Sequence, residues 1–284
     1  MSMVSPDFDQ IARTISPNDE MFHGNEHHYF GVGRSALENI ERALAAARSP
    51  SSPKRILDMP CGHGRVLRYL RARYPSADIT ACDLVRDGVD FCARNFAAIP
   101  VYSEACLSNL PLERGVFDLV WVGSLLTHFD CRRWVEFLTF FRALLTPGGV
   151  LVFSTHGRQA HAWIAGHDRD YGLGEERCRD LCEQFASVGF GYADYPGQSN
   201  FGISLSEPAW VCRLLTSLPE LRLVGFNEKA WDGHHDVFAC VRDADWKVHC
   251  TPAPDFPSPR DYNVSPKSPG KSRAPWLLWW KRSA

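Results

Sequence analysis

The sequence predicts an α/β fold built on a doubly wound, mostly parallel seven-stranded sheet with an antiparallel last strand. Between about residues 36 and 242, short β-branched apolar runs alternate with amphipathic stretches, which is the pattern of βαβ units. Two of the runs, Phe117–Val122 and Val150–Ser154, are almost continuously apolar, as strands covered on both faces are. The chain has 284 residues, of which 45% are hydrophobic, and this suffices for the core of one large domain.

The first predicted element is a helix over Ser35–Ala47, because its leucine and isoleucine residues recur at helical spacing. The seven predicted strands are Arg55–Met59, Asp78–Cys82, Ile99–Tyr102, Phe117–Val122, Val150–Ser154, Leu221–Asn227 and Asp236–Val241. Further helices are predicted over Gly64–Tyr74, Arg86–Phe96, Cys131–Leu145 and Ser206–Leu218. The last of them has Ser206 as its cap and Pro208 in its first turn. A loop joins the last two strands, which indicates a hairpin.

Two regions depart from the alternation. Residues 157–205 are polar, glycine-rich and aromatic, which predicts a helical, aromatic insertion after the fifth strand. It would form either a satellite core or a cap over the substrate. From residue 243 onward the chain is rich in proline and serine, which is typical of a disordered tail. The tail ends in Trp276–Arg282, for which we consider contact with a membrane surface, with a protein partner, or with the chain's own domain. The predicted organisation is thus a lead-in (1–34), a domain (35–242) and a tail (243–284).

Composition excludes several classes of protein. The chain has 31 basic and 33 acidic residues and a net charge of −2, so bulk binding of nucleic acid is not expected. We find no run of 18 apolar residues and no secretory signal, and we expect a cytoplasmic protein. Ten scattered cysteines fit a reducing compartment. Only Cys178 and Cys182 are close neighbours, which is not a zinc spacing, so the sequence assigns no metal ligand.

The most informative stretch, Ile56–Arg65, places a tight turn between a strand and a helix. Gly62 and Gly64 lie in the turn, where Cβ atoms would collide with a ligand approaching the backbone. The start of the following helix offers unpaired N–H groups to an anionic part of that ligand. Asp58 ends the strand before the turn and Asp83 ends the next strand. The ligand is therefore expected to lie between two carboxylates.

The two acids also indicate what this ligand is. Asp83 can accept hydrogen bonds from vicinal ribose hydroxyls. The third glycine of the dinucleotide fingerprint is missing, because Arg65, Val66 and Leu67 follow Gly64. Asp58 instead precedes the loop, where it can meet a cation. A ligand that joins adenosine to an amino-acid end satisfies both features, and S-adenosylmethionine is such a ligand.

These motifs resemble those of the class I, Rossmann-like S-adenosylmethionine-dependent methyltransferase family. The first family motif, an acid followed by three alternate glycines, is similar to Asp58–Gly64, where Pro60 replaces the first glycine. Asp83 stands at the place of the ribose-binding acid. Leu145–Phe153, with its Pro-Gly-Gly, resembles the approach to the fifth strand, and the terminal hairpin fits the family's reversed last strand. The resemblance covers about residues 30–242.

The resemblance implies S-adenosylmethionine as the cofactor and a set of residues that bind it. These residues are Asp58, Pro60, Cys61, Gly62, Gly64, Asp83, Leu84, Gly123 and Ser124. The implied reaction is transfer of a methyl group to an oxygen or nitrogen of a small-molecule or sugar (glycan) acceptor. Such an acceptor benefits from a histidine base. His128 and His156 follow the fourth and fifth strands and His234 precedes the last one, so these three are the candidate catalytic residues, with an acid or no base as the alternative.

Two other functions stay open at this stage. A non-catalytic cofactor-binding or scaffold protein would keep the fold and use its tail for partners. An NAD(P)-dependent oxidoreductase is disfavoured by the missing third glycine and by the acid before the loop. A ligand that binds only the folded state raises the melting temperature, which separates a cofactor-binding protein from one that has lost the site.

Overall fold

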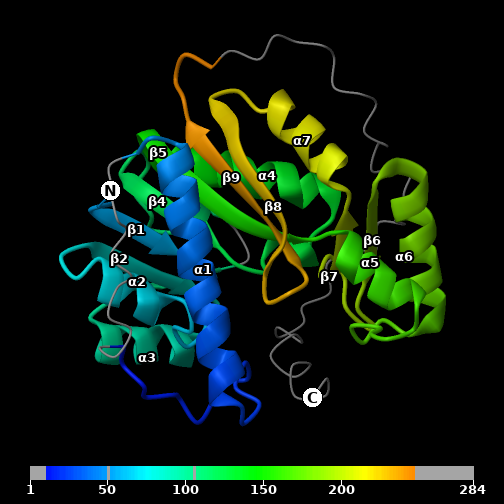
Figure 1. The fold of residues 1–284 in the computed structure, drawn as a ribbon, viewed down its shortest axis with the longest axis horizontal. Coiled ribbons are helices and arrows are strands. Elements are labelled where there is room, and N and C mark those ends of the chain that lie inside the picture. The colour runs from blue at the N-terminus through cyan, green and yellow to red at the C-terminus, as the bar shows by residue number, and fades with distance from the viewer. Residues whose placement is uncertain (1–10, 50–51, 105–106, 247–284) are drawn as a thin grey trace.

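Seven strands form one sheet in the order β3-β2-β1-β4-β5-β9-β8 (Figure 1). The structure is a computed structural model that describes residues 11–49, 52–104 and 107–246. The strands of this sheet are β1 (Arg55–Asp58), β2 (Asp78–Asp83), β3 (Ile99–Tyr102), β4 (Phe117–Val122), β5 (Leu145–His156), β8 (Leu221–Trp231) and β9 (His235–Arg242). The helices are α1 (Glu26–Ala46), α2 (Leu67–Arg73), α3 (Arg86–Phe96), α4 (Cys131–Leu144), α5 (Arg158–Ala165), α6 (Glu175–Val188) and α7 (Pro208–Ser217).

The sheet is mostly parallel, as predicted. Strands β1 to β5 pair in parallel, whereas β9 is antiparallel to both β5 and β8. The carboxyl ends of β1, β2, β4 and β5 therefore lie along one edge, where sheets of this type bind ligands. The start of β9 reaches the same edge, because its His235 pairs with the last residue of β5, His156.

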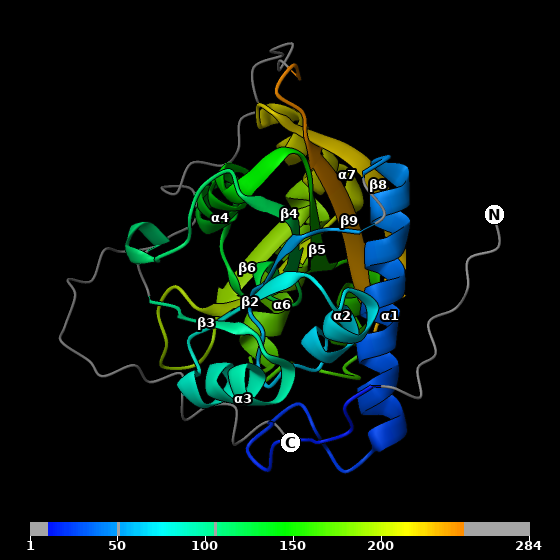
Figure 2. The same ribbon diagram turned by 90° about the vertical axis from the view of Figure 1, so that its left-hand side faces the viewer.

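Alternate residues of each strand face opposite cores. In β5, Val150 and Val152 belong to the core shared with α1, α2 and α3, while Leu151 and Phe153 belong to the core shared with α4 and α7. Figure 2 shows α1 and α2 on one side of the sheet and α4 on the other. This two-residue period explains why the central strands are apolar throughout. It also fixes the face to which each polar residue at the strand ends belongs.

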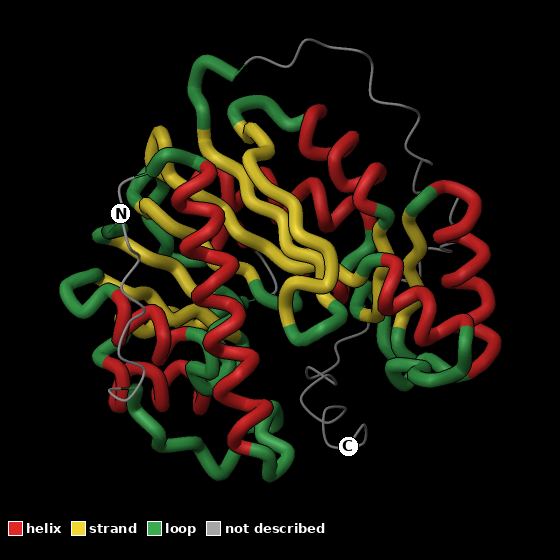
Figure 3. Tube along the Cα trace, viewed as in Figure 1, coloured by secondary structure: helices red, strands yellow, loops and turns green. Residues whose placement is uncertain are grey.

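The insertion after β5 forms a lobe beside the sheet (Figure 3). It contains α5, α6 and an antiparallel pair of strands, β6 (Phe190–Asp194) and β7 (Gly202–Ser206). Its buried apolar residues other than Phe190 form a separate cluster, which includes Ile164, Leu181 and Phe185. A satellite core is therefore present, and a role as substrate cap stays a prediction.

Several predicted boundaries were wrong, each for a local reason. Helix α1 begins at Glu26 rather than Ser35, since the Asn25 side chain accepts the N–H of His28 and caps it there. Helix α2 begins at Leu67 rather than Gly64, because residues 62–66 form turns. In α7 the capping position is Glu207 and not Ser206, which ends β7.

The sheet is also longer at its ends than the sequence predicts. Strand β5 starts at Leu145, and the Pro-Gly-Gly segment lies inside it where its pairing with β4 shifts register. Strands β6 and β7 were not predicted.

Among the described residues, no helix has both the length and the apolar character needed to span a membrane. Residues 247–284 of the predicted tail, with Trp276–Arg282, lie outside the described residues.

Candidate active site at the carboxyl edge of the sheet

Asp58 and Asp83 lie at the ends of neighbouring parallel strands. Asp58 ends β1, where it pairs with Ala81 of β2, and Asp83 follows two residues later. Both carboxylates belong to the face that packs against α1, α2 and α3, because Ile56 and Ala81 of the same strands lie in that core. The structure thus brings together the two acids that the sequence places on either side of the glycine turn.

The Asp58 carboxyl group is buried without a partner. Its side chain is 1% exposed, and neither Oδ1 nor Oδ2 has a hydrogen-bond partner. Burial, together with the neighbouring Asp83 carboxylate, raises the pKa of Asp58 well above its usual value. A buried polar group in this state costs free energy that a ligand donor or cation would recover.

The Asp83 carboxylate holds the turn in place. Oδ2 accepts the Gly62 N–H at 2.8 Å, and Oδ1 accepts the Val85 N–H at 2.9 Å. Burial raises the pKa of Asp83, and the backbone N–H donors of Val85 and Gly62 oppose that shift. A carboxylate accepts about four hydrogen bonds, so Asp83 retains acceptor capacity for a ligand.

The two glycines of the turn serve different purposes. A Cβ atom at Gly62, whose φ is +50°, would have no heavy atom within 4 Å. A Cβ atom at Gly64 would lie 2.4 Å from Cε2 of Phe96 and 3.0 Å from Sγ of Cys92. Gly64 therefore allows the turn to pack on α3, and Gly62 is the position that leaves space for a ligand. Of the other predicted loop residues, Pro60 follows a cis peptide bond and Cys61 is buried, with its thiol 3.4 Å from the Gly62 carbonyl oxygen.

The remaining predicted cofactor residues line the neighbouring loops. Leu84 is unusual because this large apolar side chain is 39% exposed next to the buried Asp83. After β4, a Cβ atom at Gly123 would lie 2.9 Å from the Trp231 ring, so that turn packs against β8. Ser124 has a positive φ of +57°, and its N–H donates to Oγ of Ser154 at 2.8 Å.

The lead-in segment covers the turn, which the sequence did not predict. His63 is buried, with Nε2 3.1 Å from Oδ2 of Asp87 and Nδ1 3.9 Å from Oδ1 of Asp19. Arg68, 1% exposed, donates to the backbone oxygens of Ala12 and Thr14. These contacts fasten residues 12–19 against α2 and the turn. The only sequence signal was an arginine among apolar positions of a predicted helix.

Three buried histidines lie together farther along the edge. His156 and His235 are directly paired across β5 and β9, with ring centroids 4.7 Å apart, and the His234 ring lies 4.2 Å from that of His235, tilted by 47°. Burial lowers the pKa of all three imidazoles. His156 and His234 are predicted catalytic residues, and His235, which precedes the predicted last strand beside His234, lies with them. The ring of Trp231, 4.9 Å from His235 and next to Gly123, joins this cluster to the loop after β4.

His128 occupies a separate position against the insertion. Its Nδ1 lies 2.9 Å from the carbonyl oxygen of Gly202, and its ring stacks on Phe201 at 5.0 Å. Because a carbonyl oxygen only accepts, Nδ1 carries the hydrogen and Nε2 keeps the lone pair. Burial lowers the pKa of His128 to about 4. The imidazole is therefore neutral near pH 7, with the Tyr195 hydroxyl also 3.2 Å from Nδ1.

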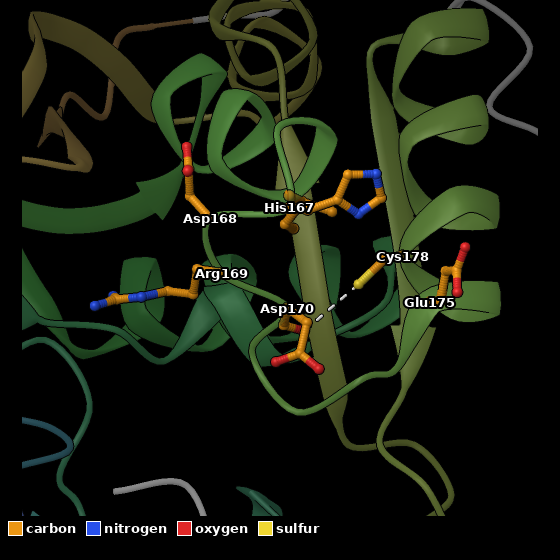
Figure 4. A pocket seen from close by; sticks show the side chains of 7 residues that line it. His167, Asp168, Arg169, Asp170, Glu175 and Cys178 are labelled. Carbon is orange, nitrogen blue, oxygen red and sulfur yellow. Dashed lines mark hydrogen bonds between the residues drawn. The ribbon is translucent and has the colours of Figure 1, made fainter.

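A cavity of about 660 Å³ lies within the insertion and not at the glycine turn. It is lined by Ile164, His167, Asp168, Arg169, Asp170, Glu175 and Cys178. Figure 4 shows that the Arg169 side chain points away from most of the others, and the Cys178 thiol donates to the backbone oxygen of Asp170 at 3.6 Å. The acceptors that suit a nucleoside with a cationic end lie at Asp58 and Asp83 instead.

Comparison with known proteins shows that this chain is similar to methyltransferases. Residues 56–149 match the family model described as a methyltransferase domain. The chain is 36% identical over 132 residues to the malonyl-acyl-carrier-protein O-methyltransferase of Laribacter hongkongensis, covering 40% of this chain and 44% of that protein. It is 32% identical over 114 residues to the fatty-acid O-methyltransferase of Mycolicibacterium smegmatis, covering 38% and 39%. The chain thus spans less than half the length of these curated relatives.

Solved structures share the fold over more of the chain. An S-adenosylmethionine-dependent methyltransferase from Clostridium acetobutylicum has a TM-score of 0.50 and 12% identity, covering 74% of this chain and 92% of that one. A plantazolicin methyltransferase in complex with S-adenosylhomocysteine has a TM-score of 0.50 and 13% identity, covering 77% and 86%. At these identities the likeness concerns the fold.

Proposed function

We propose that this chain, a member of the class I, Rossmann-like S-adenosylmethionine-dependent methyltransferase family, transfers a methyl group from S-adenosylmethionine to an oxygen of a small-molecule acceptor. The observation that carries the proposal is the buried, partnerless carboxyl group of Asp58 beside the open space at Gly62. Oxygen is favoured over nitrogen because the two curated relatives described above are O-methyltransferases. A cytoplasmic location stays a prediction.

The residues present fit the cofactor. Asp58 offers two unpaired carboxyl oxygens for an ammonium group, and Asp83 has acceptor capacity for ribose hydroxyls. Leu84 supplies exposed apolar surface for the adenine ring, and Gly62, which has no side chain, lets the ligand approach the backbone. Each of these residues thus matches one part of a nucleoside joined to an amino acid.

When bound, S-adenosylmethionine supplies an activated methyl group on a sulfonium. The protein then has to align the acceptor, exclude water and remove a proton if the acceptor is a hydroxyl. Of the three candidate histidines, His128 is the one that lies outside the buried cluster, and the Gly202 carbonyl oxygen fixes its tautomer so that the lone pair is on Nε2. His156 and His234 lie in the buried cluster and stay predictions as catalytic groups.

The relatives suggest an acyl acceptor as one concrete case. Their names specify malonyl-acyl-carrier protein and fatty acids, in which a carboxylate oxygen would receive the methyl group. A carboxylate is already ionised and needs no base, whereas a sugar or other hydroxyl does. Whether kcat depends on His128 therefore distinguishes a hydroxyl acceptor from a carboxylate acceptor. A glycan acceptor and a non-catalytic binding protein stay alternatives.

Turnover with defined acceptors tests the proposed function. We expect the full chain to form S-adenosylhomocysteine from S-adenosylmethionine only when an acceptor is added, with a fatty acid and a monosaccharide as the first pair compared. Asp58→Asn should lose both turnover and the rise in melting temperature caused by S-adenosylhomocysteine. A ligand-induced rise in melting temperature without turnover on any acceptor would indicate the binding protein. No rise with either cofactor form would contradict the proposal.

A further inference from the structure

Three imidazoles, His156, His234 and His235, form a buried cluster that the cofactor site does not use. Their side chains are 4%, 6% and 5% exposed, and one ring nitrogen of each lies within 4.8 Å of the other two. His156 and His235 are held rigidly as a cross-strand pair, while His234 stands in the turn between β8 and β9. The cluster is therefore built from two neighbouring strands and the turn that enters one of them.

Two of these rings carry an unmet hydrogen-bonding group. Nδ1 of His156 and Nδ1 of His235 are buried without a hydrogen-bond partner. Each such group costs free energy when it stays buried and unpaired. Two partnerless ring nitrogens, in a cluster where each of three imidazoles places one nitrogen within 4.8 Å of the others, indicate a ligand that accepts electron pairs from nitrogen.

We propose that His156, His234 and His235 bind a divalent transition-metal ion of the zinc class. Neutral imidazole is the form that binds such ions, and three histidines with a fourth open position are a recurrent zinc site. His234 has the supporting contact typical of a ligand, because its Nδ1 donates to the Asp232 carbonyl oxygen at 2.8 Å and leaves Nε2 for the metal. The inference does not rest on the proposed methyl transfer.

The geometry requires only a local adjustment. Zinc–nitrogen bonds of about 2.0–2.1 Å place tetrahedral ligands about 3.4 Å apart, so the nitrogens approach one another by up to about 1.4 Å on loading. His234 follows Asp232 and Gly233, both at positive φ, in a turn outside the strand pairing, and it provides the mobile ligand.

The surroundings decide which fourth ligand fits. The Trp163 ring lies 5.0 Å from His234 and the Tyr171 ring 4.9 Å from His156, which shields the site from bulk water. Arg65 and Arg169 also act electrostatically on His234, and the Asp232 carboxylate opposes them. These cations favour an anionic fourth ligand, such as hydroxide or a carboxylate oxygen.

Metal titration of the full chain tests the proposal. After treatment with a chelator, the protein is titrated with Zn²⁺ against a chromophoric chelator and, separately, with Co²⁺ to follow the visible absorption of tetrahedral cobalt. We expect one equivalent to bind and to raise the melting temperature. His235→Ala and His234→Ala should each lower Zn²⁺ affinity by at least about tenfold. Removing only the hydrogen-bond partner of a metal ligand already costs about 10–100-fold in affinity, and removing the ligand itself should cost no less.

His167→Ala is the matched control, because it removes an imidazole from the acidic cavity of the insertion, where an ion could bind adventitiously. We expect this variant to bind Zn²⁺ as the unaltered chain does. Melting temperature without metal and S-adenosylhomocysteine affinity report folding of each variant separately, so loss of methyl transfer does not affect the outcome. Binding that is equal in the unaltered chain and in folded His234→Ala, or that is lost only in His167→Ala, would overturn the proposal. So would the absence of stoichiometric binding.

Discussion

Replacing Gly62 by valine is expected to abolish binding of S-adenosylhomocysteine while the protein stays folded. The new side chain meets no protein atom within 4 Å of its Cβ, so it projects into the space assigned to the ligand. The positive φ of +50° costs a β-branched residue about 1–2 kcal/mol, which lowers stability without removing the fold. Calorimetry should detect no heat of binding.

Gly148→Val provides the matched control. Gly148 also has a positive φ, +81°, and open space at its Cβ, but it lies in the Pro-Gly-Gly segment near the start of β5. We expect this variant to share the loss of stability and to bind S-adenosylhomocysteine normally. Unchanged affinity in Gly62→Val would show that the ligand does not approach the backbone at this turn.

Replacing His128 by asparagine is expected to lower kcat by about 10²–10⁴-fold on a hydroxyl acceptor, the usual contribution of a general base. The asparagine amide can still donate to the Gly202 carbonyl oxygen, so the contact with the insertion is retained, but it cannot take up a proton. Affinity for S-adenosylhomocysteine and the melting temperature should stay unchanged, which separates a catalytic loss from a structural one.

The pH profile gives a second readout for His128. Its pKa is lowered to about 4, and a base acts in its neutral form. We therefore expect kcat/KM to be independent of His128 ionisation above about pH 5 and to fall as the pH decreases through about 4. The asparagine variant should lack this acidic limb. An unchanged kcat would contradict His128 as the base and indicate an acceptor that is already ionised, such as a carboxylate.

Much of the sheet follows from local sequence. The runs around β1, β2 and β4 are apolar on both faces, so their period and length are unambiguous, and the acids at Asp58 and Asp83 lie where the strands end. The insertion could not be predicted in the same way. Strands β6 and β7 contain glycine and polar residues, and they are defined by pairing with each other and packing on α6.

The parts of the site that the local sequence does not specify depend on contacts between distant residues. His235 contacts His156 because β9 pairs antiparallel with β5 in a register that no local pattern contains. Arg68 binds backbone oxygens of the lead-in more than fifty residues earlier, which also cannot be seen in a helix pattern. The close pair of cysteines, Cys178 and Cys182, does not belong to the histidine cluster.

A crystal structure of the full chain with S-adenosylhomocysteine at saturating concentration tests the cofactor site. We expect the ribose hydroxyls within hydrogen-bonding distance of the Asp83 carboxylate, and the ammonium group on the side of Asp58. A ligand found elsewhere, or none at that concentration, would contradict the claim that the turn between β1 and α2 binds the cofactor.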